Sequence, residues 1–582
     1  MKNKFYFSKK KIISILMLGF IMTFGCGGPF TETTLPADAN SSCESGGQAL
    51  TLAEFNTWFE SGAVTLDGLV KPANSVTFPN IPNCSFYKWT EQMYLWLTSP
   101  APRSYGGGGG LVMNSPIFYG VSLPDPITGE REFLPNTPGQ LRAFNLRTAQ
   151  NGALDLPVFI KKGSLRMLQI LPSVIAPSGN QIIADADGNE IEIGSARLNE
   201  NKQPVLLDLK GKEIKGPRAL LQSKNDKSEP LFMRRLRKLE KFDRSELVQK
   251  ITVDKLELFL DLAGNFHEAE QGQADGGVLM AQNGSLVYYS LAVNNVFAIY
   301  RTMQGATVPP NTSFPTTQAN LNSIEAFAAA NGLSPIIDSE ALAIEIKASW
   351  IRSEGLAEPE KFIRAKAEVN TYDKSNPNDW VPNGTEIVEL AMVGLHVVGS
   401  TAGHPELLWG TFEHFSNNPA AAYDYSRISG GNLNVPQNTT GSWIFCANGA
   451  AAPFNEMHMK MSGVNNDHIV PVAPFTISPS NIIRSFPWGL PGASANPNSE
   501  VISTNNKVQS FLDPADIRMN YFQTGTTWTI GGAAPTGGNE VGTNKLANTT
   551  METFVQGTNC FTCHTTNTTQ VSHIFDDTKP LF

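Results

Sequence analysis

A cysteine–histidine motif close to the carboxyl end of the chain places the strongest constraint on the fold. The stretch "GTNCFTCHTT" contains Cys560, Cys563 and His564, and the chain ends at Phe582. The few residues after the motif are too short a segment to enclose whatever the motif binds, because a pocket needs an apolar shell of its own. We therefore predict that the upstream body covers the motif, so that the segment 546–582 packs in a seam on that body.

The order and spacing of these residues match covalent haem attachment. Two cysteines on one helical turn match the separation of the two haem vinyl groups, so Cys560 and Cys563 are predicted to form thioether bonds. His564 follows directly, and its imidazole is predicted to bind the iron as the proximal ligand. The predicted cofactor is one covalently bound haem c.

Three other interpretations of the motif stay open. A zinc site needs about four ligands, usually a second Cys or His pair, and His573 is the only later candidate. A redox dithiol of the thioredoxin type belongs at a strand-to-helix junction, whereas this motif follows a Thr/Asn-rich stretch. The third interpretation is that the pattern has no chemical role.

The sixth iron ligand is left undecided by the sequence. His573 is a candidate, because the nine residues that separate it from His564 reach roughly 30 Å when extended. An open iron site, accessible to a small molecule, is the alternative. The methionines of "MHMKM" are weaker candidates because such a stripe usually packs in a core. The weaker candidates are Met457, Met459, Met461, His458, Met519 and Met551.

The first 25 residues have the pattern of an export signal. Five lysines precede an apolar run from Ile12 to Phe24, which is too short for a comfortable membrane span. Cys26 follows this run, as in bacterial lipoprotein signals, so we predict its lipidation. Thr23 and Phe24 depart from that pattern, which leaves ordinary cleavage as the alternative. The polar stretch 26–47 is predicted to be a flexible tether, and the protein to be periplasmic or anchored to the outer membrane.

The remaining cysteines are Cys43, Cys84 and Cys446, so at most one disulfide forms among them. Their spacing does not select the pair. Buried apolar thiols are an equally good interpretation.

Length and charge bound the rest of the molecule. The chain of 582 residues exceeds what one hydrophobic core normally holds, so we expect two or three units or one body with long insertions. The 50 glycines and 38 prolines favour many turns and long loops. A net charge of −9 provides no basic face for nucleic acid.

A basic segment at about 209–250 departs from this average, and it includes "MRRLRKLEKFDR". A partial apolar stripe, Leu231, Leu236, Leu239 and Phe242, underlies the basic residues. Either it is a solvated helix in an exposed insertion, or it docks an acidic redox partner or anionic lipid.

Local patterns predict short helices and hairpins in similar number. Helices are predicted for "TLAEFNTWFES", "NCSFYKWTEQMYLWLTS", "NSIEAFAAANG", "PEKFIRAKAEV" and "NTTMETFVQG". Hairpins are predicted at Asn283-Gly284 and Asp187-Gly188, and buried strands at "EIVELAMVGLHVVG" and "NEMHMKMSG". The predicted fold class is α+β: a large irregular mixed body with hairpins and short helices, with the C-terminal haem-attachment segment packed on it.

Other groups of polar residues are weaker candidates. His396 lies in an apolar strand and is expected to be a hydrogen-bonded core residue. "HPELLWGTFEHF" contains His404, Glu406, Glu413 and His414, but without a helical His-x-x-x-His pair it is not a convincing metal site.

Several stretches resemble a loose group of exported bacterial proteins identified as members of the cytochrome c family. The motif "NCFTCH" matches the c-type attachment sequence in full, and the longer matching pieces are "CSFYKWTEQMYLWLTSP", "GLHVVGSTAGHPELLWGTFEHF" and "LANTTMETF". The resemblance spans most of the mature chain and implies the class without defining a reaction. The large body before the haem departs from small c-type cytochromes, in which the motif comes early.

Together these observations predict an export signal at 1–25, a lipoprotein tether at 26–47, a mixed body at 48–545 and a haem segment at 546–582. The predicted function is haem binding and electron transfer with a redox partner protein, at a membrane reached through the lipid anchor. One alternative is a haem enzyme that acts on peroxide or another small molecule. A second alternative is a surface binding or scaffold protein with a structural haem.

Overall fold

A computed structural model describes most of the chain. The described residues are 29–44, 47–79, 83–107, 110–124, 130–146, 154, 156, 158–160, 167–199, 203–224, 230–238, 242–253, 256–267, 277–309, 312–462, 467–489, 495–557, 559–564 and 569–582. The predicted export signal and the lipidation site Cys26 lie outside them. No described helix is long and apolar enough to cross a membrane.

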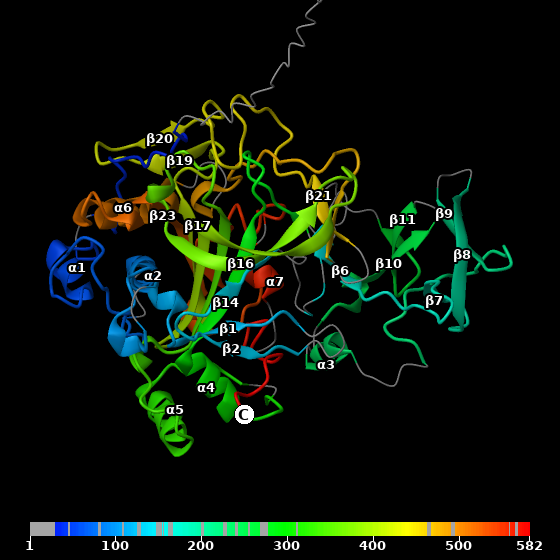
Figure 1. Cartoon of the computed structure of the whole chain (residues 1–582), viewed down its shortest axis with the longest axis horizontal. Helices are drawn as coiled ribbons and strands as arrows, with labels where there is room; N and C mark the ends of the chain where they lie inside the picture. The colour runs from blue at the N-terminus through cyan, green and yellow to red at the C-terminus, as the bar shows by residue number, and fades with distance from the viewer. Residues whose placement is uncertain are drawn as a thin grey trace, which may run out of the picture.

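A mostly antiparallel sheet of 11 strands forms the centre of the described molecule (Figure 1). Its strand order is β2-β1-β14-β15-β17-β18-β23-β24, with β16 paired to β17 and to β3, and β4 paired to β14. The strands are β1 (Phe118–Val121), β2 (Phe133–Pro135), β3 (Arg142–Ala143), β4 (Asn145–Leu146), β14 (Tyr288–Asn294), β15 (Ile344–Arg352), β16 (Arg364–Asp373), β17 (Val381–Thr401), β18 (His404–His414), β23 (Tyr521–Thr529) and β24 (Glu540–Gly542).

Helix α2 covers one face of this sheet. Its Phe86 ring stacks on Trp528 with 4.0 Å between centroids, and its Tyr94 ring stacks on Phe412 at 4.2 Å. These contacts belong to the largest apolar core of the described residues. The α-helices are α1 (Leu52–Trp58), α2 (Asn83–Leu97), α3 (Leu231–Lys238), α4 (Asn295–Met303), α5 (Gln318–Ala330), α6 (Ala495–Phe511) and α7 (Cys560–Cys563).

Three of the predicted helices are confirmed as α1, α2 and α5. The predicted cap of α1 is present, since the Thr51 hydroxyl accepts a hydrogen bond from the Glu54 amide at 3.1 Å. The predicted helix over 359–369 is wrong. Only Pro359–Lys361 forms a 3₁₀ turn, and the chain then continues as β16 because Ala367 and Val369 are buried at alternate positions against β17.

Both predicted hairpins are confirmed. Met280 bridges Leu286 around Asn283-Gly284, and Gly284 takes the positive φ of 86° that such a turn requires. The other hairpin joins β7 (Ile182–Ala184) to β8 (Glu190–Leu198). The predicted strand "EIVELAMVGLHVVG" is part of β17, whereas only the second half of "NEMHMKMSG" forms a strand, β21 (Met459–Ser462).

A separate set of strands lies to one side of the main sheet, at the right of Figure 1. One sheet contains β5 (Val158–Ile160), β6 (Met167–Leu171), β10 (Leu247–Val253), β11 (Leu256–Asp261) and β12 (Phe266–His267), and the other contains β7, β8 and β9 (Pro204–Asp208). These strands have apolar clusters of their own. The described parts of the basic segment predicted at about 209–250 lie in this region.

The remaining described elements are small. A three-stranded sheet contains β13 (Gly277–Val278), β21 and β22 (His468–Pro471), and a hairpin contains β19 (Tyr423–Ser426) and β20 (Asn432–Val435). Further 3₁₀ turns lie at Arg103–Tyr105, Val112–Asn114, Arg244–Glu246, Ser339–Ala341, Pro487–Gly489, Ile517–Asn520 and Ile530–Gly532.

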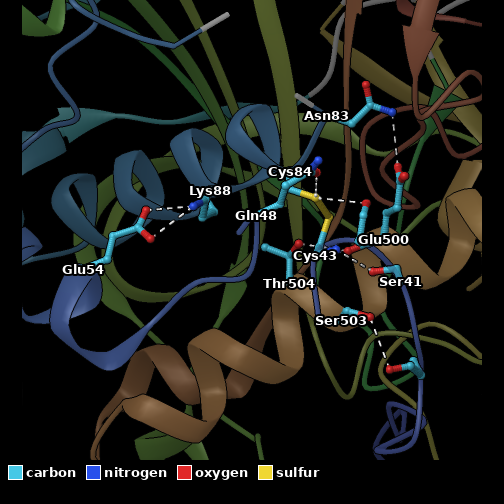
Figure 2. Close-up of a disulfide and its surroundings, with 12 residues drawn as sticks. Ser41, Cys43, Gln48, Glu54, Asn83, Cys84, Lys88, Glu500, Ser503 and Thr504 are labelled. Carbon is cyan, nitrogen blue, oxygen red and sulfur yellow. Dashed lines mark hydrogen bonds and ion pairs between the residues drawn. A yellow bond between two sulfur atoms is a disulfide. The ribbon is translucent and has the colours of Figure 1, made fainter. Parts of the chain in front are cut away.

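A disulfide joins the N-terminal segment to α2 (Figure 2). It pairs Cys43 with Cys84, while Cys446 is a buried thiol whose pKa burial raises to about 11. Near the disulfide, Lys88 of α2 forms an ion pair with Glu54 of α1 at 2.9 Å (Figure 2). The described part of the stretch predicted as a flexible tether, 29–44, instead lies against the body, where its Thr33 amide donates to a carbonyl of residue 415.

The C-terminal segment packs on the opposite face of the main sheet. Its Phe561 and Phe575 side chains are buried in one cluster with Val398 of β17 and Trp409 of β18. The predicted fold class, an irregular α+β body with the C-terminal segment packed on it, is therefore confirmed.

Candidate functional site

Strand alternation gives the main sheet two different faces. Side chains at alternate positions of a strand point to opposite faces. In β15, Ile344 and Ile346 belong to the core beneath α2, so Glu345 and Lys347 point to the other face. Lys347 is paired in register with His396 of β17, which adds a third titratable group to that face.

The segment that precedes the motif is bound to this polar face by buried hydrogen bonds. The side-chain nitrogen of Asn548, Nδ2, donates to Thr411 Oγ1 at 3.0 Å and to the Phe412 carbonyl at 2.9 Å. The Thr549 amide donates to Glu413 Oε1 at 2.6 Å. Thr550 is held in the same way, by Ser349 at 2.7 Å and by the Tyr289 hydroxyl at 2.6 Å.

The helix predicted over "NTTMETFVQG" is wrong, because the backbone bonds do not continue at helical spacing: the Glu552 amide donates to the Asn548 carbonyl four residues back, but the Met551 and Val555 amides donate to carbonyls three residues back. Asn548 Oδ1 accepts from the Thr550 amide at 3.0 Å, and Glu552 Oε2 accepts from the Asn548 amide at 2.8 Å. The backbone amide of Thr549 donates to Glu413 of β18 and not to a carbonyl of its own segment. The segment therefore forms a series of turns.

His396 and Glu552 form a pair on this face, with 3.1 Å between Nε2 and Oε1. The hydrogen bond expected of His396 is present, but the side chain is 18% exposed and lines a cavity, so the expected core position is wrong. Burial opposes the charged form of Glu552, but the charge and hydrogen bond of His396, with Lys347 and the Asn548 amide, outweigh it and lower the pKa of Glu552 to about 2.

The motif itself forms the single turn α7. Asn559 Oδ1 accepts from the Phe561 amide at 2.8 Å and begins the turn, and the His564 amide donates to the Cys560 carbonyl at 3.0 Å. The buried Phe561 ring packs 6.0 Å from Trp409 and fixes the turn on the sheet. Cys560 and His564 thus lie one turn apart, while the Cys563 side chain is outside the described part of the structure.

The His564 ring has a defined tautomer. Its Nδ1 lies 3.0 Å from the carbonyl oxygen of Val571. A carbonyl can only accept, so Nδ1 carries the proton and Nε2 keeps its lone pair. Burial, with a smaller contribution from the charge of His573, lowers the pKa of His564 well below its usual value, so the imidazole is neutral.

His573 lies directly against His564. The two rings stack with 3.9 Å between centroids and 16° between planes. Rings in van der Waals contact leave no space for a porphyrin plane between them, so ligation from the opposite face requires His573 to move. Arg235 of α3 donates to the His573 carbonyl at 2.5 Å and pairs with Asp577. The distal role of His573 stays a prediction.

A large cavity lies beside the motif. Its volume is about 1310 Å³, and both Cys560 and His564 line it. The described side chains around the motif are mixed in character, since the apolar Trp409 and Leu546 alternate with charged groups. The acidic and basic side chains on the wall, besides Cys560, His564 and His573 of the C-terminal segment, are Arg131, Arg142, Glu345, Lys347, Arg364, Lys366, Glu389, His396 and Glu552.

The residues present fit a haem attached at the motif. The cavity exceeds the few hundred to about 1,000 Å³ usual for cofactor sites. A histidine that ligates a metal usually donates its other ring nitrogen to a carbonyl or carboxylate, as His564 does to Val571. The hydrogen bond of His564 is thus the one that a proximal histidine would need.

The candidate methionine ligands lie elsewhere. Met457 and Met551 pack with Phe554 in one buried cluster, and Met459 and Met461 belong to the core of the α2 face. Met519 packs against that core, and His458 stacks on Phe475 at 4.1 Å. None of these six residues is among those that line the cavity.

The four polar residues of "HPELLWGTFEHF" are not brought together. His404 binds Glu406 at 2.8 Å, whereas His414 stacks on Phe362 at 3.9 Å. Glu413 instead faces Thr549 and Arg484. Within the described residues, no group of three His, Cys, Asp or Glu side chains is arranged to hold a metal ion.

The sequence patterns did not indicate several residues of the candidate site. Trp409 contacts the His564 ring at 4.2 Å, and Arg142 and Lys347 line the cavity. Alternation along β15 and β18 is a signal that could have placed Lys347 and Trp409 on one face. Arg142, on the two-residue strand β3, carries no such signal.

Comparison with protein-family models, with curated proteins and with solved structures gives no match to this chain.

Proposed function

We propose that this chain is an exported mono-haem c-type cytochrome that transfers electrons. Cys560 and Cys563 would hold the haem covalently, and His564 would bind its iron. Such a haem supplies a one-electron redox centre. The neutral His564 ring, with Nδ1 bound to Val571 and the Nε2 lone pair available beside the cavity, is the observation that carries the proposal.

The chain around the motif has the properties that an electron carrier needs. Trp409 and Phe561 are almost completely buried and exclude water from one side of the His564 ring. Hydrogen bonds between the segment 548–550 and the side chains of Thr411, Glu413 and Ser349 fix the chain that leads to the motif on the sheet. A rigid site changes little between oxidation states, which favours electron transfer over ligand exchange.

Export is supported by the disulfide between Cys43 and Cys84, because such bonds persist in oxidising compartments such as the periplasm. The same compartment is the one in which bacteria attach haem covalently. The signal pattern and Cys26 make a periplasmic or outer-membrane-anchored lipoprotein our proposal, with an unidentified redox protein as the partner.

A second candidate function is a haem enzyme acting on peroxide or another small molecule. The observation that favours it is the polar wall of the cavity, where Lys347 and the pair His396–Glu552 lie on the same sheet face as the motif. Groups of this kind transfer protons in haem enzymes and have no necessary role in an electron carrier.

Optical spectra of the full chain, matured in a host that exports it and attaches haem, test the two functions. For an electron carrier we expect a low-spin haem that is reversibly reduced and does not respond to cyanide or carbon monoxide. A high-spin haem that binds both would contradict electron transfer and support catalysis. The matched control is Cys446→Ala, which removes a buried cysteine outside the site and is expected to leave the spectrum unchanged.

A further inference from the structure

Arg142 is a cation on the cavity wall without a counter-charge. Its Nη1 donates to Asn114 Oδ1 at 2.9 Å, whereas its Nη2 is buried and has no hydrogen-bond partner. Among the described residues, no carboxylate forms an ion pair with it. Burial lowers the pKa of Arg142 to about 10, which leaves the group charged at neutral pH.

Glycine at position 120 makes room for this guanidinium. A Cβ atom at Gly120 would lie 3.1 Å from Arg142 Nη2, closer than such contacts normally are. Gly120 is in the middle of β1, opposite Leu134 of β2. The missing side chain at Gly120 therefore leaves room for the Arg142 guanidinium.

Arg131 approaches the chain two residues beyond Gly120, directly after the end of β1. Its Nη1 donates to the Ser122 carbonyl at 2.9 Å, and its buried Nε has no hydrogen-bond partner. Positions two apart in a strand are roughly 6.6 Å apart. Arg131 and Arg142 thus bring two guanidinium groups to neighbouring parts of one cavity wall. Neither forms an ion pair with a described residue, although the charge of Arg131 acts on Glu345 and partly offsets the effect of burial on the pKa of that carboxyl.

Arg364 is a useful comparison, because it is an arginine of the same cavity that has a carboxylate partner. It also lines the cavity, but it pairs with Glu389 at 2.9 Å, and both side chains are about 40% exposed. The acidic groups nearer the motif are already engaged, since Glu345 binds Ser572 and Glu552 binds His396. The cavity therefore has no described acidic group positioned for Arg142.

We propose that Arg142, assisted by Arg131, is a binding site for a carboxylate that enters the cavity from outside the chain. A buried charge is stable only when it is paired, and the fork of guanidinium N–H groups matches the two oxygens of a carboxylate. The carboxylate has two chemical sources. One is a propionate of the haem, which rests on the proposed function, and the other is a free organic acid.

The experiment uses the full chain, matured with its haem, as wild type and as Arg142→Gln, Arg142→Lys and Arg364→Gln. In the first arm the reduction potential is measured by redox titration. A bound propionate predicts that Arg142→Gln keeps its covalent haem but has a lower potential, because a positive charge near the iron is lost. Arg142→Lys, which keeps the charge, is expected to fall between, and Arg364→Gln to match the wild type.

In the second arm acetate and succinate are titrated into each protein and binding is followed by calorimetry and by thermal unfolding. A free organic acid as the source predicts saturable binding that weakens about tenfold or more in Arg142→Gln, as expected for a lost charge-assisted hydrogen bond. Arg364→Gln is expected to bind like the wild type. This arm does not depend on haem, so a colourless protein would refute the proposed function while this arm still tests the site.

A change specific to Arg142 in either arm supports the site and identifies its source. If Arg142→Gln and Arg142→Lys fold, as judged by circular dichroism, and match Arg364→Gln in both arms, the proposal is wrong.

Discussion

The two faces of the central sheet are built from the same strands but are held by different forces. On the α2 face, aromatic rings stack between the helix and the sheet, as Tyr94 does on Phe412. On the opposite face, the C-terminal segment is held by an apolar cluster around Trp409 and Phe561 and, in addition, by hydrogen bonds and ion pairs such as His396–Glu552. Two adjacent residues of β18 show the division: Leu408 belongs to the core of the α2 face, and Trp409 belongs to the cluster on the opposite face.

The comparison separates stability from function. Apolar packing is non-directional and tolerates small shifts, so it suits a face whose task is to keep the body folded. Hydrogen bonds are directional and fix atoms in one place, so they suit the face that positions His564. We expect substitutions on the α2 face to lower global stability, and substitutions on the other face to act mainly on the C-terminal segment.

The largest expected effect is on the α2 face. Phe412→Ala removes a ring that is completely buried and stacked on Tyr94, and should lower the free energy of unfolding by about 3–5 kcal/mol. Urea denaturation measures it. Ile387→Ala, at a position 65% exposed, is the control and should change stability by less than about 0.5 kcal/mol. A loss below about 1 kcal/mol for Phe412→Ala would contradict the assignment of this face as the stabilising core.

The disulfide on the same face should contribute a little less. The double substitution Cys43→Ser and Cys84→Ser opens a loop with a sequence separation of 41, which the chain-entropy model values at roughly 4 kcal/mol and measurements commonly at less. Thermal unfolding of both forms, with and without reductant, measures the loss. Cys446→Ser controls for the loss of a sulfur atom. A double variant as stable as the wild type would show that packing alone holds α2.

On the polar face, the pair His396–Glu552 should make stability depend on pH. The pKa of Glu552 is lowered to about 2 in the folded protein, so its contribution, roughly 3 kcal/mol, is present above about pH 4.5 and is lost as the pH falls toward 2. Glu552→Gln should abolish this part of the pH dependence in urea titrations. Glu389→Gln, in an exposed ion pair, should retain it. Parallel pH profiles for wild type and Glu552→Gln would refute the role of this pair.

The smallest expected effect is that of a substitution at Asn548, and it should be confined to the C-terminal segment. Asn548→Ala removes the amide that binds Thr411 and Phe412 and should cost about 2 kcal/mol. The loss should be local, so hydrogen exchange should speed up in the segment 548–556 and not in α2. Asn322→Ala, on the exposed side of α5, is the control. Equal acceleration in α2 would mean that the two faces unfold together.

Local sequence signals predicted much of the α2 face. The cap at Thr51, the Asn283-Gly284 turn and the long strand that became β17 follow from neighbouring residues alone. The helix predicted at 359–369 failed because the same residues also alternate, and pairing with β17 decided between the two patterns.

Of the candidate site, the sequence indicated only the cysteine–histidine motif. Cys560, Cys563 and His564 are adjacent in sequence, whereas Lys347 and His396 meet through the register of β15 and β17. Gly120 of β1 and Arg142 of β3 are 22 positions apart in sequence and meet on the cavity wall only in the folded chain. The choice of Cys43 over Cys446 as the partner of Cys84 was beyond prediction for the same reason.

The most direct test of this account is the intact mass of the chain after maturation in an exporting host, with peptide mapping of the segment that contains the motif. We predict that one haem is added per chain and that it resists extraction by acidified solvent. It should be found on the peptide with Cys560 and Cys563, and replacing both cysteines by alanine should abolish it. A matured chain of unmodified mass, with both thiols reactive, would contradict the account.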